Sequence, residues 1–265
     1  MARYCPLFSG SSGNSTYVAS GDCGLLVDAG VSAKRLAAAL NERNIDPARI
    51  AGVLVTHEHT DHIAGLRVLV KRFGIPIYAT AGTLSFLCAQ DAVPPGADLR
   101  ELAPDMTPTE VGGLQVEAFR TPHDAADSCG FRITLPDGRR VGVATDMGEM
   151  WPSVRQALSA CDLIHIESNH DVRMLETGAY PYSLKQRILG EYGHLSNAAC
   201  AAELPDLVRG GVTRITLAHL SKENNAPYLA EVVSKAALQS AGLREGVDFV
   251  LRVATPVGVE GITVF

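Results

Sequence analysis

The most constraining feature of this sequence is a cluster of metal-binding side chains directly after an apolar run. Residues 50–56 read as a short buried strand, and the next six positions hold His57, His59, Asp61 and His62. Imidazole nitrogens and carboxylate oxygens are ligands that divalent zinc, iron and manganese accept. A solvated histidine-rich turn is the alternative, but this density of ligand types at a strand end favours a metal site.

The spacing of these residues indicates two metal positions rather than one. His57 and His59 alternate along an extended segment, so their side chains can point the same way. Asp61 and His62 lie one short turn further on and would face a second position. We expect a helix to begin after this turn, at Ile63.

Strand and helix patterns alternate along the rest of the chain. The expected strands are Tyr4–Phe8, Thr16–Ala19, Gly24–Asp28, Ile50–Thr56, Ile75–Thr80, Leu99–Leu102, Leu114–Thr121, Gly130–Leu135, Arg140–Thr145, Leu163–Glu167, Thr213–Ala218, Phe249–Val253 and Gly258–Val264. The expected helices are Ser32 to about Asn44, Ile63–Phe73, Ala81–Ala89, Trp151–Ala160, segments reaching Leu207, and Pro227–Ala241. No shift in composition marks a boundary, so we predict one α/β domain over residues 1–265 with stacked sheets covered by helices.

Charge and cysteine content exclude several classes of protein. Lysine and arginine number 23 and aspartate and glutamate 29, so the formal net charge is −6. This balance argues against nucleic-acid binding through bulk positive charge. The sequence has no apolar run long enough for a membrane span and no room for a signal peptide, so we expect no membrane partner. Six cysteines without a Cys-x-x-Cys pair predict reduced thiols and a cytoplasmic location, and the oligomeric state stays open.

The string His-x-His-x-Asp-His after an apolar strand resembles the metal-binding motif of the metallo-β-lactamase fold, an αββα four-layer sandwich. The segment Leu25–Gly30 is similar to the first motif of that family, in which the aspartate, Asp28 here, braces the metal loop. The resemblance implies three further ligands after strands, and His123, Asp146 and His219 occur in the expected order. It implies that one metal is held by His57, His59 and His123, that a second is held by Asp61, His62 and His219, and that Asp146 bridges both.

The residues around this motif indicate the branch of the family. β-Lactamases of this fold usually have cysteine where Asp146 stands, so antibiotic hydrolysis is not expected. The segment from Asp146 to His219 is too short for the inserted domain of the β-CASP nucleases. Glu167 and His194 resemble elements of the ribonuclease Z-like phosphodiesterases, where the histidine assists the leaving group and the glutamate orients it. A carboxylate partner raises an imidazole pKa and fixes its tautomer, as a general acid requires, although a helix-capping role for His194 is the alternative.

Four longer strings are similar to the bacterial YycJ/WalJ-type proteins, a cytosolic branch linked to 5′→3′ exonuclease activity on DNA. They are Phe8–Ser15, Glu167–Asp171, Gly193–Asn197 and His219–Asn225. The resemblance implies two divalent metal ions, which are zinc, manganese or iron, and a nucleic acid substrate, DNA rather than RNA.

The loop Ser9–Ser15 is rich in glycine, serine and asparagine. Such a loop can bring several backbone N–H groups to one anion, and the side chains add donors. We therefore predict substrate binding by Ser11, Ser12 and Asn14, together with Asn169. An ordinary turn between two strands is the alternative for the loop.

These observations predict a dinuclear metal-dependent hydrolase, a phosphodiesterase or nuclease of the 5′→3′ DNA exonuclease type, that uses a hydroxide bridging two divalent metals. His194, Glu167 and Asp61 are the predicted catalytic side chains. Two alternatives stay open: a thioester or lactone hydrolase of the glyoxalase II type, and a non-catalytic metal-binding regulator. Two divalent ions would add +4 to the formal charge of −6, giving −2. They would concentrate positive charge at the site, which favours a short or end-on substrate.

Overall fold

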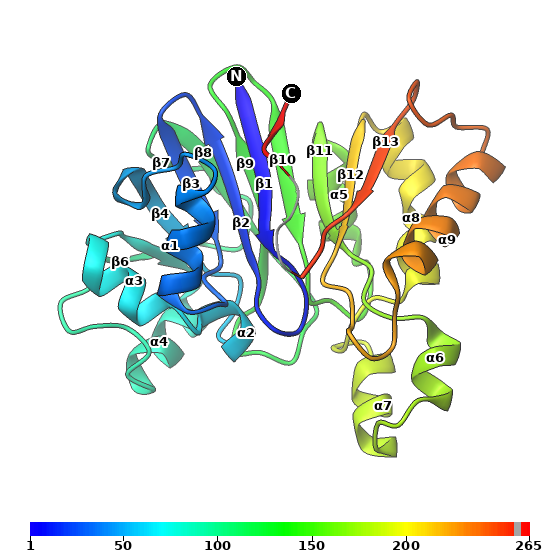
Figure 1. The fold of residues 1–265 in the computed structure, drawn as a ribbon, viewed down its shortest axis with the longest axis horizontal. Coiled ribbons are helices and arrows are strands. Elements are labelled where there is room, and N and C mark those ends of the chain that lie inside the picture. Colours follow the sequence, from blue (N-terminus) through cyan, green and yellow to red (C-terminus); the bar gives the residue numbers. More distant parts are fainter. Residues whose placement is uncertain (257–260) are drawn as a thin grey trace.

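The computed structural model describes residues 1–256 and 261–265, which form four layers in the order helix, sheet, sheet, helix (Figure 1). In spatial order the first sheet contains, among the described residues, β14 (Thr263–Val264), β1 (Ala2–Phe8), β2 (Ser15–Ser20), β3 (Cys23–Val27), β4 (Ile50–Leu54), β5 (Ile77–Ala79) and β6 (Leu99–Glu101). The second sheet contains β13 (Val250–Val253), β12 (Arg214–Ala218), β11 (Leu163–Glu167), β10 (Arg140–Ala144), β9 (Cys129–Thr134), β8 (Leu114–Arg120) and β7 (Thr109–Val111). The predicted αββα arrangement is confirmed.

Three hydrophobic cores hold the layers together. One lies between the sheets, where side chains such as Leu25 and Leu54 of the first sheet meet Phe131 and Val141 of the second. The outer face of the first sheet packs against α1 (Ala33–Asn41), α3 (Leu66–Phe73) and α4 (Ala81–Ala89). The outer face of the second packs against α5 (Pro152–Ser159), α8 (Asn197–Arg209) and α9 (Pro227–Ser240).

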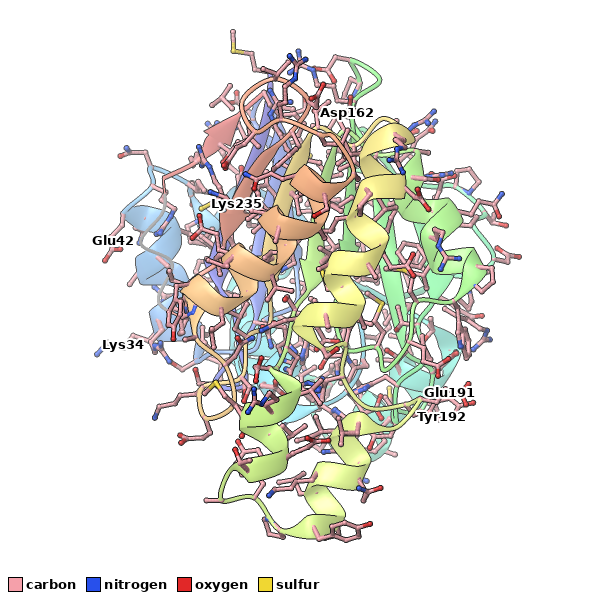
Figure 2. The ribbon with its side chains drawn as sticks, turned by 90° about the vertical axis from the view of Figure 1, so that its right-hand side faces the viewer. Lys34, Glu42, Asp162, Glu191, Tyr192 and Lys235 are labelled. Carbon is pink, nitrogen blue, oxygen red and sulfur yellow. The ribbon has the colours of Figure 1, made fainter. Side chains whose placement is uncertain are left out.

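Two short helices extend beyond this sandwich. Figure 2 shows α8 and α9 side by side over the second sheet, with α6 (Val172–Thr177) and α7 (Tyr182–Leu189) projecting below them. The projecting pair lies beside the loop that carries His194. In the described part of the chain, no helix is both long and apolar enough to cross a bilayer.

Parallel strand pairing brings distant parts of the sequence to one edge. β3 pairs with β4 in parallel, and β10, β11 and β12 also run parallel to one another. The carboxyl ends of such strands meet at the same edge of their sheet, where α/β proteins bind ligands. Figure 1 places α2 (Thr60–Ile63) at this edge, whereas the two chain termini meet at the opposite one.

Most predicted elements are present, but three details differ. The helix predicted from Ile63 is wrong in its start, because Asp61 and His62 lie within the short helix α2 and α3 begins separately after Gly65. A Cβ at Gly65 would lie 2.0 Å from the Val31 carbonyl oxygen, so the chain is tightly packed at this break. The prediction also omits β7, whose three residues are too few to show the alternation of apolar and polar side chains that is typical of a strand. The last predicted strand falls partly on residues 257–260, outside the described residues.

Candidate metal centre

Three histidines from two strand ends form a first group of ligand atoms. His57 and His59 follow β4, and His123 follows β8 of the other sheet. One ring nitrogen of each lies within 4.8 Å of the others, and His123 Nε2 is 3.2 Å from His59 Nδ1. Burial lowers the pKa of His57 well below its usual range, so the ring is neutral, the form that binds metal. Its buried Nε2 has no hydrogen-bond partner among the described residues.

A carboxylate and two histidines form a second group. Asp61 and His62 lie on α2, and His219 follows β12. Asp61 Oδ2 is 3.4 Å from His219 Nε2 and 3.6 Å from His62 Nε2. The two groups therefore match, residue for residue, the two ligand sets that the sequence resemblance implies.

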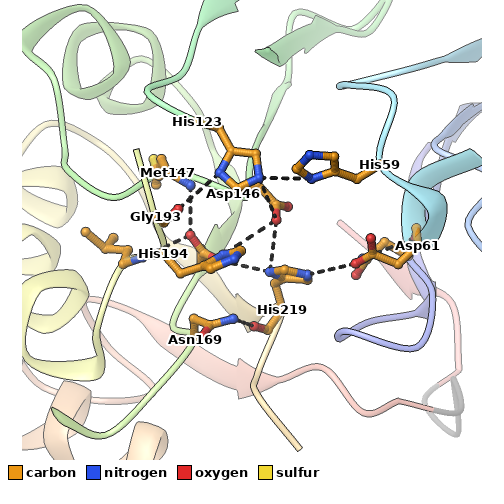
Figure 3. Close-up of polar contacts among 12 residues, drawn as sticks. His59, Asp61, His123, Asp146, Met147, Asn169, Gly193, His194 and His219 are labelled. Carbon is orange, nitrogen blue, oxygen red and sulfur yellow. Dashed lines mark hydrogen bonds and ion pairs between the residues drawn. The ribbon is translucent and has the colours of Figure 1, made fainter. Parts of the chain in front are cut away.

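Asp146 lies between the two groups (Figure 3). Its Oδ2 is 3.2 Å from His62 Nε2, and its Oδ1 is 3.4 Å from His219 Nδ1 and 3.8 Å from His123 Nε2. The side chain is buried, and Oδ2 has no hydrogen-bond partner within the described ranges. A buried carboxylate that faces both groups fits the position of a bridging ligand, so this donor set suits a pair of divalent ions.

Two further carboxylates hold the second-group histidines by their Nδ1 atoms. His62 Nδ1 donates to Asp28 Oδ2 at 2.8 Å, and His219 Nδ1 donates to Glu167 Oε1 at 2.8 Å. Asp28 also accepts hydrogen bonds from the backbone N and the Oγ1 of Thr56. With Nδ1 held in this way, the Nε2 atom of each ring faces the proposed metal position. Asp28 therefore contacts both the start of the histidine loop and His62, as the sequence resemblance implies.

Three of these residues have left-handed backbone conformations. Asp28, Asp146 and His219 have φ values of 63°, 59° and 54°. A non-glycine residue pays about 1–2 kcal/mol for this conformation, which aspartate and histidine tolerate better than most. Each follows a parallel strand, so the turn directs its side chain back toward the common centre. Strain of this kind is typical of functional sites.

Glu167 also binds His194, the predicted general acid. His194 Nδ1 donates to Glu167 Oε1 at 2.9 Å, while Glu167 Oε2 accepts from the backbone N atoms of Met147 and Leu195. Burial raises the pKa of Glu167, but His194 and the hydrogen bonds from His194 and His219 outweigh it and lower the pKa to about 2. The predicted contact is therefore present, and one ionised carboxylate oxygen serves both histidines, which the sequence did not indicate.

His59 of the first group and Asp61 and His219 of the second line a central hollow of about 230 Å³, together with Asp146 and His194. Of the predicted substrate-binding residues, Ser11 and Asn169 line it, and the Asn169 amide donates to the His219 carbonyl oxygen. Ser12 is exposed and is not among the lining residues. Sequence reasoning missed one wall, which comes from α7 and the segment just before it and includes Tyr180, Leu184, Arg187 and Ile188. No motif marks these four positions.

The family assignment follows from a comparison with known proteins. A family model described as "Beta-lactamase superfamily domain" matches residues 24–219. The chain belongs to this superfamily. Exodeoxyribonuclease YycJ of Bacillus anthracis is 34% identical over 96% of this chain and 96% of its own length. Exodeoxyribonuclease WalJ of Streptococcus pneumoniae is 36% identical over 93% of this chain and 92% of its own length.

The fold of this superfamily member also matches solved structures. The metallo-β-lactamase fold protein YhfI from Bacillus subtilis aligns over 97% of both chains with a TM-score of 0.71 and 18% identity. At this identity the likeness concerns the fold alone. The predicted family and fold are both confirmed.

The glycine- and serine-rich loop braces the metal centre of this superfamily member. The backbone N of Asn14 donates to the Asp61 carbonyl oxygen at 2.8 Å, and its side-chain Nδ2 lies 3.1 Å from His62 Nε2. The Asn14 Oδ1 accepts from the Gly10 N–H, and the Ser9 hydroxyl accepts from the His219 N–H. Several donors of the loop are thus already used within the protein.

Gly30 is needed for this packing, because a Cβ there would lie 1.7 Å from the Asp61 carbonyl oxygen. We expect Gly30→Ala to displace α2, lower the free energy of unfolding by about 2 kcal/mol and weaken metal binding. Thermal melting and metal titration measure both effects. Gly261→Ala is the control, since a methyl group at Gly261 would meet no described residue within 4 Å. Unchanged metal affinity in Gly30→Ala would contradict the expectation.

Metal loading should release protons from two histidines. The Asp146 and Asp28 carboxylates outweigh burial and hold the pKa of His62 well above its usual range. Although burial lowers the pKa of His219, Asp146 and hydrogen bonds to Asp61 and Glu167 raise it to about 10. Without metal, both rings are therefore protonated at pH 7, and a metal can bind only after each loses its Nε2 proton.

We expect about two or more protons to be released per chain when metal ions are added to the metal-stripped protein at pH 7. Calorimetric titration with Zn²⁺ or Mn²⁺ in buffers of different ionisation enthalpy measures this number. A release of one proton or fewer would show that the two rings are neutral beforehand. His165 provides a control, because its Nδ1 bonds the Tyr4 hydroxyl at 2.6 Å and burial lowers its pKa to about 3. His165→Asn should leave the proton count unchanged.

Proposed function

We propose that this protein is a metal-dependent phosphodiesterase that acts as a 5′→3′ exodeoxyribonuclease. The observation that carries the proposal is the Glu167–His194 pair, which lies beside the carboxylate of Asp146. His194 Nδ1 is 2.9 Å from Glu167 Oε1 and 3.6 Å from Asp146 Oδ1. The relatives YycJ and WalJ, which are named as exodeoxyribonucleases, support the same activity.

The metal ligands follow from the two groups of side chains. We infer that Asp146 would contact both ions, that His57, His59 and His123 would hold one, and that Asp61, His62 and His219 would hold the other. When bound, two such ions polarise a phosphate and make hydroxide available near neutral pH. Nitrogen and oxygen ligands of this kind admit zinc, manganese or iron.

The remaining polar side chains bind the substrate and transfer a proton to the leaving oxygen. His194 uses Nε2 to protonate the leaving oxygen, because its Nδ1 is already held by Glu167. Ionised Glu167 fixes the orientation of the His194 ring through this hydrogen bond. General acid catalysis of this kind contributes about 10²–10⁴-fold in rate. Ser11 and Asn169 line the central hollow, and we infer that the Ser11 hydroxyl and the second N–H of the Asn169 amide donate hydrogen bonds to phosphate oxygens.

The two alternatives receive less support from this arrangement. A thioester releases a thiolate, which needs less help from an acid than the alkoxide of a phosphodiester. A metal-binding regulator has no use for a histidine held beside the metal groups by a buried carboxylate. We therefore favour phosphodiester hydrolysis on DNA, within the predicted cytoplasmic setting.

Labelled nucleic acids test the proposal directly. Linear single- and double-stranded DNA, circular DNA and RNA are incubated with protein loaded with Zn²⁺, Mn²⁺ or Fe²⁺. We expect nucleotides to be released from the 5′ end of linear DNA, circular DNA to be resistant, and a chelator to stop the reaction. No cleavage of any nucleic acid by metal-loaded protein would contradict it, and turnover of a glutathione thioester instead would favour the glyoxalase II alternative.

A further inference from the structure

A second hollow, which we call the side hollow, opens next to the central one. It has a volume of about 720 Å³ and lies between α2, α4 and α7. His59, Asp61 and Arg187 line both hollows, so the two are continuous beside the metal groups. Figure 1 shows α4 and α7 on opposite sides of α2, so the side hollow lies between the two halves of the sandwich.

The walls of the side hollow are unlike those of a phosphate site. Phe86 of α4 is 39% exposed, and Ile63 and Ala92 add aliphatic surface beside it. Glu58 and Asp61 contribute carboxylates, and Glu58 Oε2 has no hydrogen-bond partner in the described part of the chain. An exposed aromatic ring with aliphatic neighbours suits the flat face of a nucleobase, whereas the carboxylates would repel a phosphate.

A single arginine stands where the two hollows join. Among the described lining residues Arg187 is the only lysine or arginine of either hollow. Its guanidinium forms a paired hydrogen bond with Asp124, at 2.5 and 2.9 Å, and the side chain remains 47% exposed. Asp124 directly follows the ligand-type residue His123, so this pair fixes α7 relative to the metal groups. An exposed guanidinium in this position can bind a backbone phosphate.

The position of His194 indicates which nucleotide would occupy the side hollow. His194 lines the central hollow but not the side hollow. Since the leaving oxygen must reach His194, the nucleoside that stays bonded to the phosphate has to lie elsewhere along the groove. The side hollow is the part of the groove that begins at His59 and Asp61 and leads away from His194.

We propose that the side hollow binds the nucleobase next to the scissile phosphate, on the retained side of the substrate, with the base stacked on Phe86 and its backbone phosphate at Arg187. This rests on the proposed exodeoxyribonuclease function. A base can stack on Phe86 only when it is unpaired and separated from its neighbour, so the substrate at this position is single-stranded.

The test compares Phe86→Ala with wild-type metal-loaded protein on two substrates: single-stranded DNA and methyl p-nitrophenyl phosphate, a base-free phosphodiester whose retained methyl group cannot stack. Loss of one base-stacking contact is expected to lower kcat/KM on DNA about tenfold more than on the base-free substrate, mainly through KM. Phe86→Trp should restore DNA cleavage. Tyr228→Ala is the matched control, because Tyr228 is an exposed aromatic residue of α9 that lines neither hollow.

An abasic nucleotide moved stepwise along the DNA locates the contact. With wild-type protein, kcat/KM should fall about tenfold when the abasic nucleotide stands at one position next to the scissile phosphate. With Phe86→Ala, an abasic nucleotide at that position should cause no further fall in kcat/KM. Equal cleavage of DNA by wild type and Phe86→Ala, or additive losses at every position, would overturn the proposal. If wild-type protein cleaved no DNA at all, the proposed function would fall as well, which separates the two outcomes.

Discussion

Asp146→Asn is expected to lose bound metal and to lower phosphodiester turnover by about 10³-fold or more, which corresponds to about 4 kcal/mol of transition-state stabilisation. Asp146 is the carboxylate that faces both ligand groups, at 3.8 Å from His123 Nε2 of the first group and 3.2 Å from His62 Nε2 of the second. An amide keeps the shape of the side chain but cannot supply the negative charge shared by two cations. Asparagine also tolerates the left-handed backbone at this position, where φ is 59°, whereas alanine would add strain.

Elemental analysis after gel filtration measures the metal content of Asp146→Asn, and hydrolysis of labelled DNA measures its turnover. Asp162→Asn is the control, because Asp162 precedes β11 at the opposite end of the same sheet (Figure 2) and should affect neither quantity. Circular dichroism confirms that both variants are folded. Full metal occupancy together with wild-type turnover in Asp146→Asn would exclude the bridging role.

The local part of the metal centre could be predicted because its ligands are close together in sequence. His57, His59, Asp61 and His62 follow one strand, so their chemistry and spacing can be recognised without knowing the fold. His123, Asp146 and His219 are isolated residues, and a strand end alone would not distinguish them from ordinary capping groups. Their order along the chain, compared with a family motif, was the information that joined them to the cluster.

The remaining features depend on tertiary structure and left no pattern in the sequence. Helix α2 has only four residues and is held by backbone contacts with the loop around Asn14, so helix propensity could not predict its start. The double role of Glu167 requires His194 and His219 to approach it from separate loops. Phe86 and Arg187 lie on helices from different halves of the chain, and only their common hollow relates them to the substrate.

His194→Gln is expected to keep its metal while DNA hydrolysis falls by about 10²–10⁴-fold, the usual contribution of a general acid. The imidazole of His194 is not among the residues we assign to either metal. It is held instead by the 2.9 Å hydrogen bond from Nδ1 to Glu167. Metal content is measured by elemental analysis, and the rate by single-turnover cleavage of labelled DNA. Undiminished cleavage would exclude the general-acid assignment.

The leaving group separates a chemical role of His194 from a structural one. A p-nitrophenolate leaves without being protonated, so His194→Gln should slow bis(p-nitrophenyl) phosphate hydrolysis by less than about tenfold, far less than DNA hydrolysis. Equal losses on both substrates would indicate a distorted site instead. Glu167→Gln should behave differently, because the same Oε1 also holds His219 at 2.8 Å. Loss of the Glu167 carboxylate is expected to weaken metal affinity by about 10–100-fold and to lower the rate of hydrolysis as well. The two variants therefore distinguish His194, which transfers the proton, from Glu167, which positions both histidines.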